Sequence, residues 1–155
     1  MSASEAEAAW GIGERELAIT RWIAATRPQV FKAWSDAALF RKWWVPEGFG
    51  ITMLECDIDL RTGGSYRLVY AFGDAGEMAF HGIYPEVVPD AHIVWTNAED
   101  PDGALTTVTF ADQGGGTLLT LHEHYPSKEA RDEALVGSAL ALPQQLGQLA
   151  ALLGV

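Results

Sequence analysis

Hydrophobic and polar residues alternate along much of the chain, which is the pattern of half-buried β-strands. A first strand is predicted over residues 16–24. Its alternation places four side chains on one face: Leu17, Ile19, Arg21 and Ile23. Six further strands are predicted over residues 53–59, 66–72, 78–88, 92–97, 105–111 and 117–125. Glycine-rich turns join several of these strands, which predicts an antiparallel sheet with short connections.

Two short helices are predicted after the first strand. Thr26 is a favourable N-cap, and Gln29 three residues later completes a capping box for a helix that ends near Ser35. Asp36 can cap a second short helix, and Pro46 follows the end of its apolar pattern.

A long C-terminal helix is predicted over residues 127–153. Its apolar stripe consists of five leucines: Leu135, Leu142, Leu146, Leu149 and Leu153. Pro143 lies within this stripe, and we expect it to kink one continuous helix. The element order therefore predicts an α+β fold in which a curved antiparallel sheet of about seven strands wraps around this helix. A cavity is expected between the sheet and the helix.

Composition narrows the domain organisation and the classes of partner. The 155 residues suit one domain, with residues 1–14 expected to form a flexible N-terminal arm and 15–155 the domain. The net charge of −11 argues against nucleic acid or an anionic membrane as partner. The N-terminus has no signal-peptide pattern, and Cys56 is the single cysteine. These features predict a cytoplasmic protein. Exposed sheet edges leave a homodimer open.

Several segments resemble a known family. They read RWIAATRPQVFKAWSD (21–36), RKWWVPEG (41–48), DLRTGGSYR (59–67) and HGIYPEVVP (81–89). On these segments the chain resembles the START-like (SRPBCC, helix-grip) superfamily, and within it the branch named for the activator of heat-shock protein 90 ATPase. The resemblance implies a helix-grip fold that holds a small apolar molecule. The family usually carries Gly-Trp near the start of its last helix, whereas Gly137 is followed here by Ser138, which implies a differently shaped cavity.

Aromatic and aliphatic side chains on the predicted inner faces are candidates to line the cavity. They are Tyr66, Phe80, Tyr84, Trp95 and Phe110 from the sheet, with Leu142 and Leu146 from the helix. Trp43 and Trp44 are adjacent on a helix and cannot both point inward, so we expect one to pack and the other to border the opening. Plain core packing is the alternative for the aromatic residues.

Two charged residues fall among inward-facing apolar ones. Glu123 shares a strand face with Leu119 and Leu121, and Arg21 lies between Ile19 and Ile23. A buried charge is unfavourable unless it is paired or neutralised. The first and last strands are neighbours in a helix-grip fold, so we expect Arg21 and Glu123 to meet. The pair is either a structural ion pair or a polar anchor for a ligand.

The sequence predicts no metal site and no cofactor. His122 and His124 share the solvent face of one strand, without a third ligand clearly placed to complete a zinc site. Cys56 is expected to be a buried, unreactive thiol.

Three hypotheses for function follow from these residues. The first is binding of a small hydrophobic or amphipathic molecule in the cavity. The second is an enzyme of cyclase, dehydratase or hydrolase type that uses Glu123 and a tyrosine in the same cavity. The third, from the resemblance, is an interaction module that modulates a chaperone ATPase. The sequence favours binding over catalysis.

Overall fold

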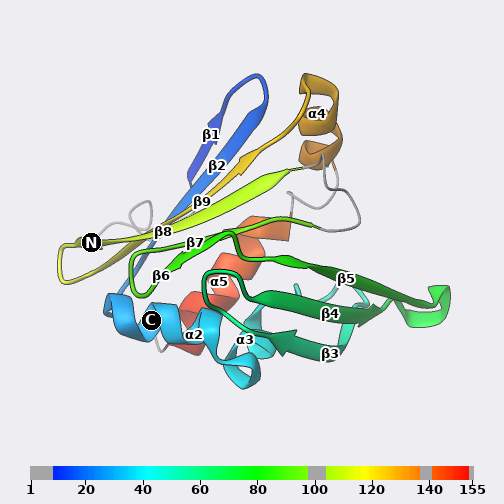
Figure 1. The fold of residues 1–155 in the computed structure, drawn as a ribbon, viewed down its shortest axis with the longest axis horizontal. Coiled ribbons are helices and arrows are strands. Elements are labelled where there is room, and N and C mark those ends of the chain that lie inside the picture. Colours follow the sequence, from blue (N-terminus) through cyan, green and yellow to red (C-terminus); the bar gives the residue numbers. More distant parts are fainter. Residues whose placement is uncertain (1–8, 98–103, 137–140, 154–155) are drawn as a thin grey trace.

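The computed structural model describes residues 9–97, 104–136 and 141–153 (Figure 1). The strands in these ranges are β1 (Ala9–Ile12), β2 (Glu16–Ile23), β3 (Thr52–Ile58), β4 (Ser65–Ala71), β5 (Glu77–Ile83), β6 (Glu86–Val88), β7 (His92–Trp95), β8 (Leu105–Gln113) and β9 (Gly116–His124). The helices are α2 (Arg27–Ser35), α3 (Ala37–Trp43), α4 (Lys128–Val136) and α5 (Leu142–Leu152), with a 3-10 turn η1 (Gly73–Ala75). Within this described part, every helix is too short or too polar to cross a membrane.

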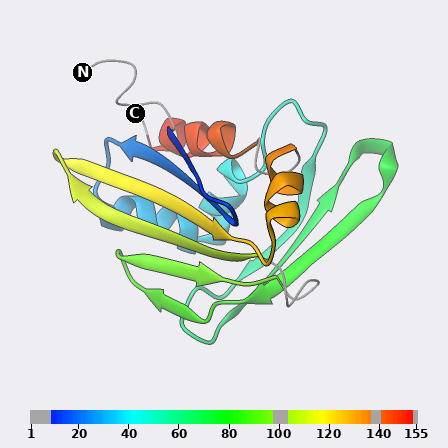
Figure 2. The ribbon, with the colours of Figure 1, turned by 90° about the horizontal axis from the view of Figure 1, so that it is seen from above.

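The strands form two antiparallel sheets that meet at one edge. Their orders are β1-β2-β9-β8-β7-β6 and β3-β4-β5. The sheets are linked where the Thr96 N–H donates to the Ile83 carbonyl oxygen at 3.1 Å. Gly82 permits this approach, because a Cβ there would lie 1.9 Å from the Thr96 carbonyl oxygen. Figures 1 and 2 show the two sheets as one curved wall, with α2, α3 and α5 on its inner side.

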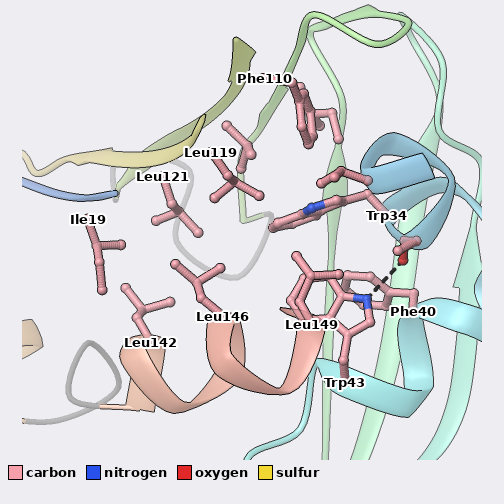
Figure 3. Packing of buried hydrophobic residues seen from close by; sticks show 14 of the residues in the cluster. Ile19, Trp34, Phe40, Trp43, Phe110, Leu119, Leu121, Leu142, Leu146 and Leu149 are labelled. Atoms are coloured by element: carbon pink, nitrogen blue, oxygen red, sulfur yellow. Dashed lines mark hydrogen bonds between the residues drawn. The ribbon is translucent and has the colours of Figure 1, made fainter. Parts of the chain in front are cut away.

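The core lies between α5 and the inner faces of β2 and β9. The apolar side chains that meet there are labelled in Figure 3 and include Ile19, Leu119, Leu121, Leu142, Leu146 and Leu149. Because alternate residues of a strand point to one face, Leu17, Ile19 and Ile23 of β2 are buried, while Arg21 on the same face is partly buried. The predicted α+β fold with a curved antiparallel sheet and a C-terminal helix is confirmed.

The two short helices begin where the capping residues predict. The Thr26 side chain accepts from the Gln29 backbone N–H, and the Gln29 side chain accepts from the Thr26 N–H, which is a complete capping box. The Asp36 side chain accepts from the Ala38 N–H at 2.9 Å and so begins α3. Asp36 is both the C-cap of α2 and the N-cap of α3, so this one residue sets the turn between the two helices.

The prediction of one kinked helix over residues 127–153 is wrong. Two helices, α4 and α5, occupy this region, and they run in different directions in Figure 2. Pro143 lies in the first turn of α5. Backbone N–H groups in the first turn make no hydrogen bond within the helix, so a proline there costs none and fits the start of a helix. Gly137 and Ser138, where the sequence departs from the family pattern, lie outside the described residues.

The strand boundaries differ from the prediction at three places. Ala9–Ile12, expected to belong to a flexible arm, pair with β2 as the edge strand β1. Pro85 divides the predicted strand 78–88 into β5 and β6, since proline cannot donate to a ladder. A register shift between Met53 and Glu55 turns Leu54 outward, so Met53 is buried and Leu54 is exposed.

Candidate functional site

A pocket of about 520 Å³ lies between the inner face of the curved wall and α5. Ten aromatic side chains line it, from α2, α3, β4, β5, β7 and the segments that follow α3, β4 and β5. Its polar lining also includes Asn97, Thr106, Glu123 and Gln145. Phe49 lines the pocket and is 54% exposed, so the opening lies beside the segment after α3.

Trp34 of α2 connects the core to the pocket wall. Its ring centroid lies 4.7 Å from that of Trp43, 5.8 Å from that of Trp44 and 5.8 Å from that of Trp95. These separations are typical of edge-to-face and tilted aromatic packing. The aromatic cluster therefore forms one rigid wall of the pocket.

The adjacent tryptophans at the end of α3 have different environments. Trp43 has no exposed surface, and its Nε1 donates to the Ala33 carbonyl oxygen at 2.9 Å. Trp44 lines the pocket, and its Nε1 donates to the Tyr70 hydroxyl at 2.9 Å. Adjacent helical positions point about 100° apart, which gives one indole to the core and the other to the pocket.

Glutamines of α5 hold the backbone of Trp43–Glu47, the segment beside the opening. Gln148 Nε2 donates to two carbonyl oxygens of this segment, each at 2.8 Å. Gln148 Oε1 accepts from the Glu47 N–H at 2.8 Å. Gln145 and Gln144 each donate to a further carbonyl oxygen of the segment. The segment Trp43–Glu47, which forms the mouth of the pocket, is therefore hydrogen-bonded to α5 through side-chain amides.

Glu123 is the one charged side chain of the pocket lining among the described residues. The Tyr125 hydroxyl donates to Glu123 Oε1 at 3.1 Å, and the Thr106 hydroxyl donates to Oε2 at 3.3 Å. Burial raises the pKa of the Glu123 carboxyl, while these two hydrogen bonds and the nearby His122 act to lower that pKa. Thr106 stands between Glu123 and Trp95 in the sheet register, so the three form one row across β9, β8 and β7.

Tyrosine hydroxyls supply further polar groups. The Tyr66 hydroxyl donates to the Thr96 carbonyl oxygen at 2.7 Å. Tyr84 lines the pocket, and no hydrogen bond of its hydroxyl is found within the described ranges. Burial raises the pKa of both Tyr70 and Tyr84, so these hydroxyls stay protonated at neutral pH.

The structure brings most of the predicted site residues to the pocket. Those that line it are Trp44, Tyr66, Phe80, Tyr84, Trp95, Glu123 and Leu142. Three others are buried in the core behind the lining, namely Trp43, Phe110 and Leu146. Phe110, for example, packs edge-on against Phe31 with ring centroids 5.8 Å apart. Alternation along a strand predicts the inner face but cannot tell the lining from the packed core.

The expected meeting of Arg21 and Glu123 is wrong. β2 and β9 are neighbours as predicted, but the register pairs Arg21 with Leu119 and Glu123 with Leu17. Four residues of extended strand separate the two positions by about 13 Å. Arg21 does not line the pocket, and its Nε is buried without a hydrogen-bond partner within the described ranges. Which strands are neighbours was predictable, but their register was not.

Other candidate chemistry stays away from the pocket. His122 Nε2 lies 3.2 Å from Glu16 Oε1 on the outer face of the sheet. Across the described part of the chain, no group of three or more metal-binding side chains is found. Cys56 is half-buried, and burial raises the pKa of its thiol, which disfavours the reactive thiolate.

Sequence reasoning missed the residues that shape the mouth and hold Glu123. Gln145 and Gln148 are three apart and adjoin the leucine stripe of α5, a spacing that could have indicated a buried polar contact. Thr106 alternates with Val108 and Phe110, which places it on the inner face of its strand.

Comparison with protein families identifies the chain. Residues 24–154 match the model of the family described as Activator of Hsp90 ATPase homolog 1-like protein. The chain belongs to this family. The resemblance to the branch named for the activator of heat-shock protein 90 ATPase is thereby confirmed. Among curated proteins, none matches the sequence.

Solved structures share the fold over nearly the whole chain. A Rhodobacter sphaeroides protein is 28% identical with a TM-score of 0.82, and the match covers 95% of this chain and 97% of that one. A Chromobacterium violaceum protein is 30% identical with a TM-score of 0.73, covering 88% and 96% of the two chains. An AHSA1-like protein from Aeromonas hydrophila is 20% identical with a TM-score of 0.73, covering 88% and 92%, a likeness of fold alone.

Proposed function

We propose that this protein binds a small hydrophobic or amphipathic molecule in the pocket between the sheets and α5. The observation that carries the proposal is a space of about 520 Å³ lined by ten aromatic rings and few polar groups. Small-molecule sites are typically concave, largely apolar and roughly 300–1,000 Å³ in volume.

The size of the pocket argues for an occupant. Protein cores are close-packed, and an unfilled cavity is destabilising by about 24 cal/mol per Å³. Solvent through the opening reduces this penalty, but water is a poor partner for aromatic faces. An apolar ligand would recover that free energy on binding.

A fluorescent probe tests the proposal directly. The neutral dye N-phenyl-1-naphthylamine is expected to bind the wild type with a rise in emission. Ala141 lines the pocket, so Ala141→Trp should occupy part of it and weaken dye binding. Ala151 is on the exposed side of the same helix, so Ala151→Trp is a matched control that should bind as the wild type does. Equal dye binding by both folded variants would contradict the proposal.

A further inference from the structure

Glu123 has the hydrogen bonding of a carboxylate and lacks a cationic partner. Both of its oxygens accept from hydroxyl groups, those of Tyr125 and Thr106. Hydrogen bonds to the charged form favour ionisation. No salt bridge to Glu123 is found among the described residues. A partly buried carboxylate without a paired cation is unfavourable, and a ligand can supply the missing charge.

The pocket lining in the described part of the chain has no cation to complete this site. The pocket lining in the described ranges contains no lysine, arginine or histidine. The segments outside those ranges, 1–8, 98–103, 137–140 and 154–155, also contain none of these residue types. Arg21, the cation on the inner face of β2, is four register positions away from Glu123. The described lining therefore leaves the counter-charge for Glu123 to a ligand.

We propose that the occupant of the pocket is a cationic amphiphile, a protonated amine whose ammonium group pairs with Glu123 while its apolar body lies among the aromatic rings. This inference rests on the proposed binding function. Trp95 lies in the same sheet row as Glu123, and aromatic faces attract ammonium groups as well as apolar chains. The chain's net charge of −11 also favours the approach of cations over anions.

The same geometry discriminates against other amphiphiles. A fatty acid would bring a second carboxylate into a pocket whose one charged lining group is already acidic, with no cation within the described lining to compensate. Like charges at close range in a desolvated site repel strongly. A neutral alcohol can hydrogen-bond to Glu123 but leaves its charge uncompensated. The expected order of affinity is therefore amine, then alcohol, then carboxylate.

The pH dependence of ligand binding should be set mainly by Glu123, because few other titratable groups lie beside it. Tyr125 and His122 flank Glu123 on β9, while its neighbours on β2 and β8 are Leu17 and Thr106. The α5 residues of the lining, Ala141, Leu142 and Gln145, do not titrate. Amine binding should therefore weaken as the pH falls through the pKa of Glu123.

The test compares three ligands of equal chain length, octylammonium, 1-octanol and octanoate, as displacers of the neutral dye. In the wild type at pH 7, octylammonium should bind at least about tenfold more tightly than octanol, with octanoate weakest. Glu123→Gln keeps the shape but cannot ionise, so it should remove the preference for the amine and leave octanol binding nearly unchanged. Glu129→Gln removes a charge from an exposed position of α4 outside the pocket lining and is the matched control, with the preference retained.

The outcomes separate this inference from the proposed function. Equal affinity for amine and alcohol in the wild type, or an amine preference that survives in Glu123→Gln, would overturn the cationic ligand while pocket binding stands. Failure of the dye and all three displacers to bind would overturn both. The inference is supported if the preference for the amine is lost in Glu123→Gln and kept in Glu129→Gln. The preference should also weaken at low pH only in proteins that carry Glu123.

Discussion

Replacing Trp43 and Trp44 singly by alanine should separate a packing role from a pocket role. A tryptophan side chain buries about 150–250 Å², which at about 25 cal/mol per Å² corresponds to about 4–6 kcal/mol for complete burial. Trp43 has no exposed surface and donates to Ala33, so Trp43→Ala should cost about 3–5 kcal/mol, as large core truncations do. Trp44 has one side on the pocket, so Trp44→Ala should cost about half as much.

The assay is urea unfolding followed by far-ultraviolet circular dichroism, which does not depend on the tryptophans removed. A loss of about 3–5 kcal/mol can exceed the stability available to a domain. Trp43→Phe, which keeps an aromatic ring, is therefore measured alongside. Binding of the neutral dye is the second measurement. Trp44→Ala should weaken dye binding, and Trp43→Phe should leave it nearly unchanged. Equal losses of stability at both positions, with equal effects on the dye, would refute this division of roles.

Four further changes test other parts of the structure. Folding raises the pKa of Glu123 above its ordinary value of 4.5, so the folded protein holds this proton more tightly than the unfolded chain does. The wild type should therefore lose stability as the pH rises from about 4.5 through the folded-state pKa. Melting temperatures measured across this pH range should show the loss in the wild type and not in Glu123→Gln. Gln148→Leu removes the amide hydrogen bonds to the segment Trp43–Glu47 and should lower the free energy of unfolding by about 1–3 kcal/mol, with weaker dye binding. An unchanged urea midpoint and dye affinity would contradict a role of Gln148 in holding this segment. Gly82→Ala should cost at least about 1–3 kcal/mol by forcing a Cβ against the Thr96 carbonyl, and a wild-type melting temperature would argue against close contact of the two sheets. Cys56 should react with iodoacetamide more slowly in the native protein than in urea at the same pH, because its thiol pKa is raised and it is half-buried; equal rates would contradict this.

Local patterns were sufficient for α2, α3 and most of the strands, but not for β1 or for the division of the C-terminal region into α4 and α5. The Thr26–Gln29 capping box and the Asp36 cap depend on side chains that bond to nearby backbone, so α2 and α3 begin where the sequence indicates. The inner faces of β2 and β9 follow from the period of two along each strand. The family and the helix-grip fold followed from several segments taken together, as the match over residues 24–154 confirms.

Contacts between distant residues were decided only by the tertiary structure. Arg21 and Glu123 are both inward-facing by pattern, but the β2–β9 register separates them, because alternation says nothing about how two strands slide along one another. Pro143 fits a helix kink or a helix start equally well by local rules, and packing of α5 against the sheet selected the start. The amides of Gln145 and Gln148 reach backbone about a hundred residues earlier in the chain.

The sequence by itself determined most of the element types, the inner faces of β2 and β9, and the family, because these depend on short-range periodicity, capping and turn chemistry. Only the tertiary structure separated Trp44 from Trp43, surrounded Glu123 with two hydroxyl donors and no cation within the described lining, and left an aromatic space of about 520 Å³ beside it. Those features depend on strand register and helix placement, which are set by the sum of many long-range contacts.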